Sequence, residues 1–334
     1  MAVTIRDVGA KAGVSQATAA RALAGYGHVS AAVRDRVQLA ARELGYVPNS
    51  VARALASGMT HAVGLIVGDI ENPFFSAVAR GMSNVLEESG RTVLLANSDE
   101  DVDRERIAIE ALRARQVDSL VVVPSSAAAS PHLRAAAADA PLVLLDRTIR
   151  GFAVDSVTVD NRGGARRAVE HLVGHGHRRI ALVSDEPSIS TSAERLAGYR
   201  VALEAAGIAA DEHLISLGGS TPEEGYRAAR RVLEAPERPT ALFTANNFMT
   251  LGAMRALHDL GLRVPRDVSL VGFDDLEWTT LVDPPVTVVS QPATELGEAA
   301  ARLVLGRLQG VDGRPRRIRL DTKLIIRASC ASAG

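Results

Sequence analysis

Residues 4–23 read TIRDVGAKAGVSQATAARAL, and this stretch decides the fold of the N-terminal part of the chain. Thr4 and Ser15 are of the types that cap helices, and Gly13 is of the type that ends one. Two short helices joined by a turn that contains Gly are typical of a helix-turn-helix. A third helix is predicted over residues 30–45, where apolar residues recur at helical spacing between a Ser and a Gly. The stretch therefore opens a three-helix module.

The second helix of such a module lies in the major groove of DNA and presents its first residues to base edges. Here those residues are Gln16, Ala17 and Arg21. Gln pairs with adenine, Arg pairs with guanine, and Ala contacts the methyl group of thymine. Ser15 and Thr18, at the helix start, suit contacts to phosphates. Helices alone leave open the alternative of a small protein-binding module.

The charge of the chain is unevenly distributed. Residues 1–60 hold seven basic and three acidic residues, a net charge of +4, whereas the whole chain has a formal net charge of −1. The remainder is therefore acidic. This asymmetry is expected if only the N-terminal part meets nucleic acid, although a charged module with no such role would show it too.

Residues 49–59 are predicted to form a hinge helix of under two turns and a linker. Isolated helices below about 12 residues are marginal in water, so we expect this one to form only with a second copy and a DNA groove. Leu55, at its exposed centre, is a candidate wedge between base steps of the minor groove. The alternative is a linker leucine packed on the rest of the chain.

These segments resemble the LacI/GalR family of bacterial repressors in a dense, ordered set of motifs. The motifs are Val3-Thr-Ile-Arg-Asp-Val8, Ala12-Gly-Val-Ser15, His28-Val-Ser30, Gly45-Tyr-Val-Pro-Asn49 and Val51-Ala-x-x-Leu-Ala56. One departure is Ala19-Ala20, where the family usually has Val then Ser, which implies the loss of a phosphate contact. The candidate DNA-binding residues are Thr4, Ser15, Gln16, Ala17, Thr18, Arg21, His28, Asn49, Ala52, Arg53 and Leu55.

Beyond residue 62, short runs of Val, Ile and Leu alternate with amphipathic helical stretches. This alternation predicts parallel sheets covered by helices, in two groups before and after about Asp160. In open α/β sheets a ligand binds beyond the carboxyl ends of the strands. The runs are 64–67, 92–95, 120–123, 142–145, 180–183, 241–243, 269–272 and 286–290.

The predicted strand ends carry carboxylates, amides and an Arg beside one or two aromatic residues. Such a set satisfies several ring hydroxyls while an aromatic face covers the apolar side of the ring. A sugar or similar polyol is therefore the expected ligand. Each residue taken singly has an alternative role, because Asp and Asn at strand ends commonly cap the following helix.

This part also resembles the same family and the periplasmic sugar-binding proteins of its fold, up to Arg327. Its motifs include Asn72-Pro-Phe-Phe75, Leu145-Asp-Arg147, Arg195-Leu-Ala-Gly-Tyr199 and Val271-Gly-Phe-Asp-Asp275. An Arg at position 195 suits ring hydroxyls, a carboxylate or a phosphate, and the sequence does not choose among them. The candidate effector-binding residues are Asp69, Asn72, Phe74, Asp146, Arg147, Arg195, Asn246, Asp274 and Gln291.

Three positions depart from the family pattern. Asn247 replaces an Asp that often follows Asn246, while Ser220 and Ala293 stand where aromatic residues are common. Fewer aromatic platforms leave room for a ligand that is larger, more polar or less flat than a plain hexose.

Enzyme and metal functions are not expected. His171, His175 and His177 lie near no set of carboxylates or thiolates that would complete a zinc site. No phosphate-binding Gly pattern opens the first strand. The single cysteine, Cys330, excludes an internal disulfide and falls in a C-terminal tail that we expect to be frayed. No catalytic residue, metal or cofactor is therefore assigned.

The sequence predicts an α/β protein that acts as a DNA-binding repressor controlled by a small polar effector, a sugar or sugar derivative. Its expected partners are a near-palindromic operator in double-stranded DNA, the effector and a second copy of the chain, with no membrane. It lacks the start of a secretory signal, so a cytoplasmic, nucleoid-associated location is expected. The alternative is a solute-binding protein whose N-terminal helices dock another protein.

The predicted divisions are a helix-turn-helix domain at 1–48, a hinge helix and linker at 49–59, and a two-lobed periplasmic-binding-protein-like domain at 60–334. Within the last of these, lobe 1 is expected at 60–160 and 290–319 and lobe 2 at 161–289 and 320–330.

Overall fold

The computed structural model describes residues 3–24, 28–46, 59–128 and 130–333. The chain divides into two compact units, Met1–His61 and Ala62–Gly334. In the described part of the chain, no helix is both long enough and apolar enough to cross a bilayer.

The first unit contains helices α1 (Ile5–Ala12), α2 (Gln16–Ala24) and α3 (Ala31–Glu43). The backbone N–H and the hydroxyl of Thr4 donate to the Asp7 carboxylate at 2.8 and 2.7 Å. These hydrogen bonds lower the pKa of Asp7 and fix the start of α1. Gly13 ends α1 with a left-handed φ of 67°. Val8 and Ala19 pack at the centre of the unit, which confirms the predicted three-helix module.

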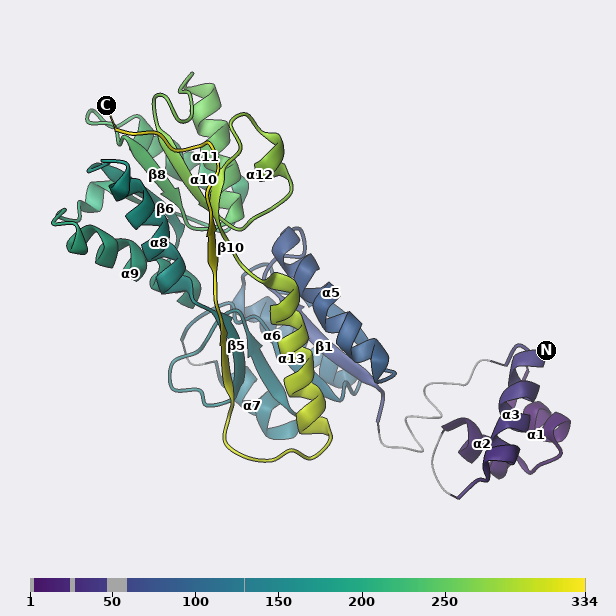
Figure 1. Ribbon diagram of the computed structural model, residues 1–334. Coiled ribbons are helices and arrows are strands. Elements are labelled where there is room, and N and C mark those ends of the chain that lie inside the picture. Colours follow the sequence, from purple (N-terminus) through teal and green to yellow (C-terminus); the bar gives the residue numbers. More distant parts are fainter. Residues whose placement is uncertain (1–2, 25–27, 47–58, 129, 334) are drawn as a thin grey trace. The chain divides into compact units, whose positions relative to one another are not determined.

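The second unit consists of two lobes, each a parallel sheet between helices (Figure 1). The first lobe contains β1 (Ala62–Val67), β2 (Thr92–Asn97), β3 (Ser119–Val122), β4 (Leu142–Leu145), β5 (Asp155–Val159), β11 (Arg317–Leu320), α5 (Pro73–Glu88), α6 (Val102–Ala114), α7 (Pro131–Asp139) and α13 (Ala293–Leu308). The second lobe contains β6 (Ile180–Asp185), β7 (Ile215–Gly218), β8 (Ala241–Thr244), β9 (Ser269–Phe273), β10 (Thr287–Ser290), β12 (Lys323–Ile325), α8 (Asn161–Gly174), α9 (Ser190–Ala205), α10 (Pro222–Leu233), α11 (Asn247–Asp259), α12 (Trp278–Leu281) and the 3₁₀ helix η1 (Glu212–Leu214).

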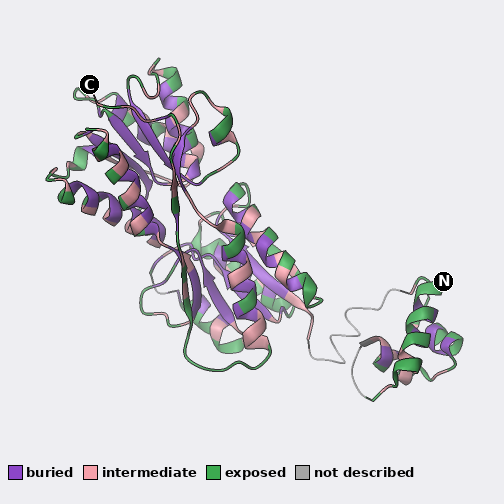
Figure 2. Ribbon diagram, in the orientation of Figure 1, coloured by how far each residue is buried: buried purple, intermediate pink, exposed green. Residues whose placement is uncertain are grey.

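The strand orders are β11-β5-β4-β3-β1-β2 and β12-β10-β9-β8-β6-β7. Every pairing is parallel except that of β12 with β10. Helices cover both faces of each sheet, so the central strands are mostly apolar and are buried, as Figure 2 shows. The predicted α/β class is therefore confirmed.

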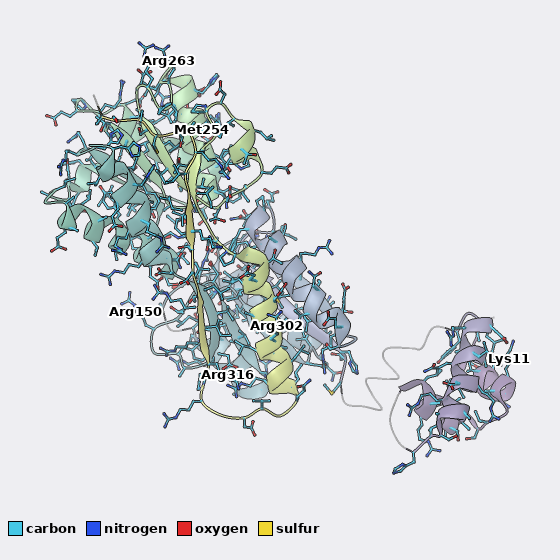
Figure 3. All side chains as sticks on the ribbon, in the orientation of Figure 1. Lys11, Arg150, Met254, Arg263, Arg302 and Arg316 are labelled. Atoms are coloured by element: carbon cyan, nitrogen blue, oxygen red, sulfur yellow. The ribbon has the colours of Figure 1, made fainter. Side chains whose placement is uncertain are left out.

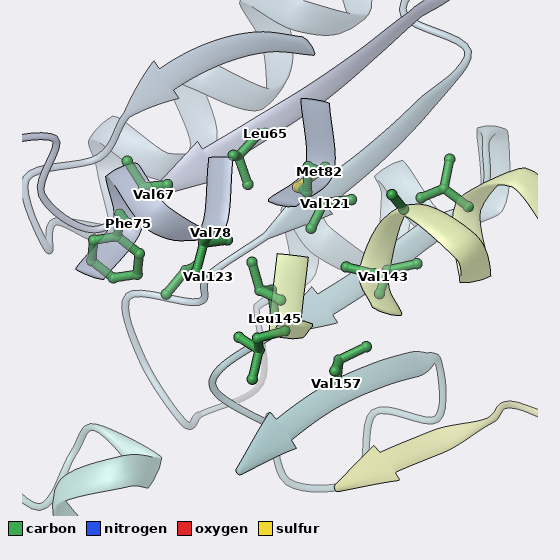
Figure 4. Close-up of a cluster of buried hydrophobic side chains, with 14 of the residues drawn as sticks. Leu65, Val67, Phe75, Val78, Met82, Val121, Val123, Val143, Leu145 and Val157 are labelled. Atoms are coloured by element: carbon green, nitrogen blue, oxygen red, sulfur yellow. The ribbon is translucent and has the colours of Figure 1, made fainter. Parts of the chain in front are cut away.

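The first lobe has one hydrophobic core on each face of its sheet, against α6 and α7 on one face and against α5 and α13 on the other. Val67, Val123 and Leu145 from the strands meet Val78 and Met82 from α5 (Figure 4). Many long charged side chains lie on the surface, and the labelled Arg150, Arg302 and Arg316 are exposed (Figure 3).

The chain passes between the lobes after β5, after β10 and after β11. Two of these crossings are bonded to each other. The backbone N–H of Asp160 donates to the Leu320 carbonyl at 2.8 Å, and the Thr322 hydroxyl donates to the Asp160 carbonyl at 3.2 Å. Arg167, from α8, donates to the Thr322 carbonyl at 2.8 Å. The crossings therefore form a narrow hinge at one side of the lobes.

All the runs predicted as strands are strands, but β5, β7, β11 and β12 were not predicted. In β11, exposed Arg317 and Arg319 alternate with apolar residues, because this strand forms one edge of its sheet. The strand β7 is an edge strand too and mixes Ser and Gly with its apolar residues. Edge strands carry a weaker apolar signal than buried central ones.

The expectation of a frayed C-terminal tail is wrong. Ser329 is fully buried, and its hydroxyl accepts from the Thr287 backbone at 2.7 Å and donates to the Leu270 carbonyl at 2.6 Å. His177 Nε2 lies 3.0 Å from the Ala331 carbonyl. The backbone N–H of Ala333 donates to the His175 carbonyl at 2.8 Å. Buried polar contacts therefore hold the tail against the second lobe, and no local sequence pattern predicts these contacts.

The contact between α5 and α13 gives a stability prediction. A Cβ added at Gly297 would lie 2.0 Å from the Val78 carbonyl oxygen of α5. Gly297→Ala must push the two helices apart, so we expect it to lower the free energy of unfolding by about 1–3 kcal/mol. Urea denaturation measures this change.

Gly306→Ala is the matched control on α13, because a Cβ there meets only Val311 Cβ at 4.0 Å. We expect this variant to gain up to about 1 kcal/mol from better helix propensity. Equal effects of the two substitutions would contradict the close-packing explanation.

Candidate functional site

The helix α2 presents one polar face to solvent. Gln16, Ala17 and Arg21 are exposed, whereas Ala19 and Ala22 of the same helix are buried against α1 and α3. The Arg21 Nε donates to the Ala17 carbonyl at 3.3 Å, which lays the side chain along the helix. The three predicted base-reading residues therefore share one accessible face.

The start of α2 is held by its own side chains. The Ser15 hydroxyl accepts from the Thr18 backbone at 3.1 Å and lies 2.9 Å from the Thr18 hydroxyl. His28 is exposed beyond the end of the helix. Thr4 has its hydroxyl engaged with Asp7. Four predicted DNA-binding residues, Asn49, Ala52, Arg53 and Leu55, and the hinge helix lie outside the described residues.

In the second unit, the carboxyl ends of strands from both lobes converge on one polar cluster, and the two lobes touch there. The Asn247 side chain donates to the Asp274 carboxylate at 2.9 Å, within the second lobe, and to Asn72 Oδ1 at 3.0 Å, across to the first. Gln291 also donates to Asp274. The backbone N–H of Thr148 donates across the lobes to the Ser190 hydroxyl at 3.0 Å.

The contacts of Asn247 explain why an Asn stands at this position instead of the Asp that is common in the family pattern. Its amide supplies two donors, one to Asp274 and one to Asn72. An Asp at this position has no such donor when ionised and places a second negative charge against Asp274. The Asn therefore joins the lobes directly, and it belongs to the site although it was not among the predicted effector-binding residues.

Arg147 is held by groups of its own lobe. Its guanidinium forms an ion pair with Glu100, with Nη2 at 2.7 Å from Oε1, and donates to the Pro124 carbonyl at 3.1 Å. The paired carboxylates raise the pKa of Arg147 against the effect of burial. One nitrogen, Nε, is buried without a hydrogen bond and lies 3.7 Å from the Asp146 carboxylate.

Arg195 is the corresponding cation of the second lobe. Its Nε donates to Asn161 Oδ1 at 2.8 Å and its Nη1 to the Ala245 carbonyl at 2.5 Å. The guanidinium carbon lies 3.8 Å from the centre of the Phe273 ring, a cation–π contact. Because Arg195 is buried, these contacts fix its orientation at the strand ends.

Two buried carboxylates of the cluster are incompletely bonded. Asp146 and Asp185 are 5% and 6% exposed, and within the described part of the chain Oδ1 of each has no hydrogen bond. The second oxygen of Asp185 accepts from Asn246 at 2.6 Å. Desolvation raises the pKa of each to about 6, although the two Arg side chains lower it. Buried polar atoms without partners are costly, so these oxygens mark positions where a ligand would be bonded.

Two cavities open beside this cluster. The larger, about 570 Å³ and called the acidic cavity below, is lined by six carboxylates, those of Asp69, Glu71, Asp99, Glu100, Glu186 and Glu224, and by Ser220. The smaller, about 310 Å³, is lined by Phe74, Asp274, Gln291 and Ala293. Ser220 and Ala293, the two positions without the family's aromatic residues, thus each line a cavity.

The structure brings the nine predicted effector-binding residues to the strand ends around the cluster and its cavities, but the prediction missed others. Glu100, Asp185 and Asn161 are part of the cluster. Asp185 ends β6 and Glu100 follows β2, so the strand-end rule that found Asp146 applied to both. Asn161 follows β5 and begins α8, so the same rule applied to it, whereas its contact with Arg195 has no sequence signal.

Two parallel-sheet lobes, a hinge of crossing segments and a polar cluster with unbonded atoms between the lobes define a binding protein of the periplasmic type. Residues 169–330 match the model of the periplasmic binding protein-like domain, and residues 4–49 match that of the bacterial regulatory proteins, lacI family.

The repressor CytR of Escherichia coli is 35% identical over 329 residues, covering 98% of this chain and 96% of that protein. A structure of the transcriptional regulator CelR with cellobiose is 36% identical, covers 98% of this chain and 99% of that chain, and has a TM-score of 0.75. The lac repressor dimer bound to operator and an anti-inducer is 29% identical, covers 99% and 100% of the two chains, and has a TM-score of 0.87. The chain belongs to the lacI family of bacterial regulatory proteins, which confirms the resemblance found in its motifs.

The buried carboxyl group of Asp146 gives a prediction about how the stability of the folded chain depends on pH. The pKa of Asp146 is about 6 in the folded chain against an ordinary 3.8, so the folded state holds this proton more tightly. Stability therefore falls as pH rises from about 4 to about 6. Asp146→Asn removes this loss, and we expect it to raise the free energy of unfolding by about 1–3 kcal/mol at pH 7.5 and by little at pH 4.

Urea denaturation of the effector-free chain at the two pH values measures the effect. Asp312→Asn, at an exposed position, is the control and should change stability little at either pH. A loss of stability for Asp146→Asn at pH 7.5 would contradict a desolvated, incompletely bonded carboxylate.

Proposed function

We propose that the chain is a sequence-specific DNA-binding repressor whose operator affinity is set by a sugar or sugar derivative bound between its lobes. The observation that carries the proposal is the buried cluster at the strand ends, in which Asp146 Oδ1 and Asp185 Oδ1 accept no hydrogen bond from the residues that the structure describes. Family membership supports the DNA-binding half, and the cellobiose complex of CelR supports a sugar as effector.

The proposed DNA contacts divide into base-reading and phosphate-binding groups. Gln16, Ala17 and Arg21 read base edges from the exposed face of α2. Phosphates are bound by Thr4, Ser15, Thr18 and His28, with Asn49, Ala52 and Arg53 continuing towards the proposed wedge, Leu55. A dimer places two such faces in successive major grooves about 34 Å apart, on a near-palindromic operator. The complex of the lac repressor dimer with its operator supports this assembly.

The proposed effector contacts come from both lobes. The first lobe contributes Asp69, Asn72, Phe74, Asp146 and Arg147. The second lobe contributes Arg195, Asn246 and Asp274, and Gln291 comes from the segment between β10 and α13 that connects the two lobes. A ligand that bonds to both sides favours the closed arrangement of the lobes over the open one. It changes DNA affinity only as far as it binds the two arrangements differently.

The remaining parts of the proposal concern class and organisation. The chain is a regulator and not an enzyme, as its relatives are regulators. It acts in the cytoplasm, where its DNA is. We propose the division into 1–48, 49–59 and 60–334, with lobe 1 at 60–160 and 290–319 and lobe 2 at 161–289 and 320–330.

Gel-shift with the DNA upstream of its own gene tests the function. We expect a retarded band at low salt, and we expect Arg21→Ala to weaken binding to the preferred site at least about fivefold, since one bidentate base contact is worth about 1–3 kcal/mol. Binding to unrelated DNA should fall much less, because Arg21 reads a base.

Arg302→Ala, which removes an equal charge from an exposed position on α13, is the control and should bind as the wild type does. Absence of a retarded band with the wild-type chain would contradict the repressor function. An unchanged site preference in Arg21→Ala would contradict the role of that residue alone.

A further inference from the structure

The two cations of the effector cluster are already occupied by protein acceptors. Arg147 donates to the Glu100 carboxylate and to the Pro124 carbonyl. Two of the three guanidinium nitrogens of Arg195 donate to Asn161 and Ala245. A phosphate or carboxylate is bound most strongly by two parallel N–H donors of one guanidinium. Such a pair would compete here with the contacts that orient both side chains.

The unbonded atoms of the cluster are mostly acceptors. Asp146 Oδ1, Asp185 Oδ1 and Gln291 Oε1 have no hydrogen bond with any described residue. The unbonded groups that can donate are fewer: Nε of Arg147, and the hydroxyl of Ser184, which can also accept. Asp146 and Asp185 are more than nine-tenths buried. A ligand that completes this set must therefore supply mainly donors. Sugar hydroxyls do so, and a fully ionised phosphate group has none.

The cavity beside the cluster is lined by negatively charged side chains, which also disfavour an anionic ligand. Six carboxylates line the acidic cavity, and its lining contains no Arg, Lys or His. Glu100 belongs to both the cavity and the cluster, since it lines the first and binds Arg147 in the second. Glu71 and Glu186 are exposed to the cavity and form no salt bridge with any described residue. Salt bridges from Arg104 and Arg147 offset the charges of Asp99 and Glu100. The other four lining carboxylates form no salt bridge with a described residue, so an anionic ligand entering here meets net repulsion.

We propose that the effector site selects an uncharged, hydroxyl-rich sugar and rejects its phosphate ester or acid form. The inference rests on the proposed function and deepens it, because it resolves the choice that the sequence leaves open at Arg195. Arg195 is a positioning residue for ring hydroxyls and not a clamp for an anion.

The test compares matched pairs by isothermal titration calorimetry with the full chain: ribose with ribose 5-phosphate, glucose with glucose 6-phosphate, and cellobiose with its 6-phosphate. For whichever sugar binds, we expect the phosphate ester to bind at least thirtyfold more weakly. A phosphate ester that binds as tightly as its parent sugar, or more tightly, overturns the proposal.

Glu71→Gln/Glu186→Gln examines the electrostatic cause. We expect the ratio of the two affinities to fall at least fivefold in this variant. The control Glu87→Gln/Glu88→Gln removes two exposed carboxylates at the end of α5, outside the cavity, and should leave the ratio unchanged. An unchanged ratio in the cavity variant overturns the charge mechanism.

Inorganic phosphate and sulfate decide the inference independently of the sugar's identity. We expect neither to give a saturable rise in melting temperature with the wild-type chain, and a saturable rise that Arg195→Lys removes overturns the proposal. If no sugar binds and none changes the gel-shift, the effector half of the proposed function fails. If a phosphate ester alone releases or recruits DNA, the proposed function stands and this inference fails.

Discussion

The incomplete bonding of carboxylates buried at strand ends is the constraint on which the second unit depends. Parallel strands direct their carboxyl ends to one edge, and both lobes turn that edge towards the other. Asp146 and Asp185 are buried there, and one oxygen of each has no hydrogen bond with any described residue. The desolvation cost is left in the effector-free chain and falls when a ligand supplies donors. The same unbonded oxygens therefore lower the stability of the protein without its effector and strengthen the binding of an effector that donates to them.

The rest of the second unit holds this edge in position. Apolar central strands, closely packed helices such as α5 and α13, and the bonded crossing segments keep each lobe rigid while joining the lobes along one side. Within each lobe, Arg147 and Arg195 are fixed by local acceptors rather than by the opposite lobe. Two rigid bodies with few direct bonds between them respond to a ligand by changing their arrangement. The hydrogen bond from the Asn247 amide to Asn72 is one of those few bonds.

Much of this organisation follows from the sequence because it depends on local patterns. Helix caps such as Thr4, apolar runs such as 120–123 and polar residues after strands are read from neighbouring residues, and they located the module, the sheets and most of the cluster. Glu100, Asp185 and Asn161 follow the same rule and were overlooked. The contacts of Asn161, Asn247 and the buried tail at Ser329 differ, because they join residues far apart in the sequence. Single-sequence reasoning has no signal for such pairs.

The central claim is that the effector completes the bonding of Asp146 and Asp185. Carbon-13 NMR of the aspartate carboxyl groups, assigned with Asp146→Asn and Asp185→Asn and recorded with and without the sugar that binds, tests it directly. We expect two carboxyl groups to titrate near pH 6 in the empty chain and well below this in the complex, where hydroxyl donors stabilise the ionised form. Identical titration of both groups in the two states would contradict the account.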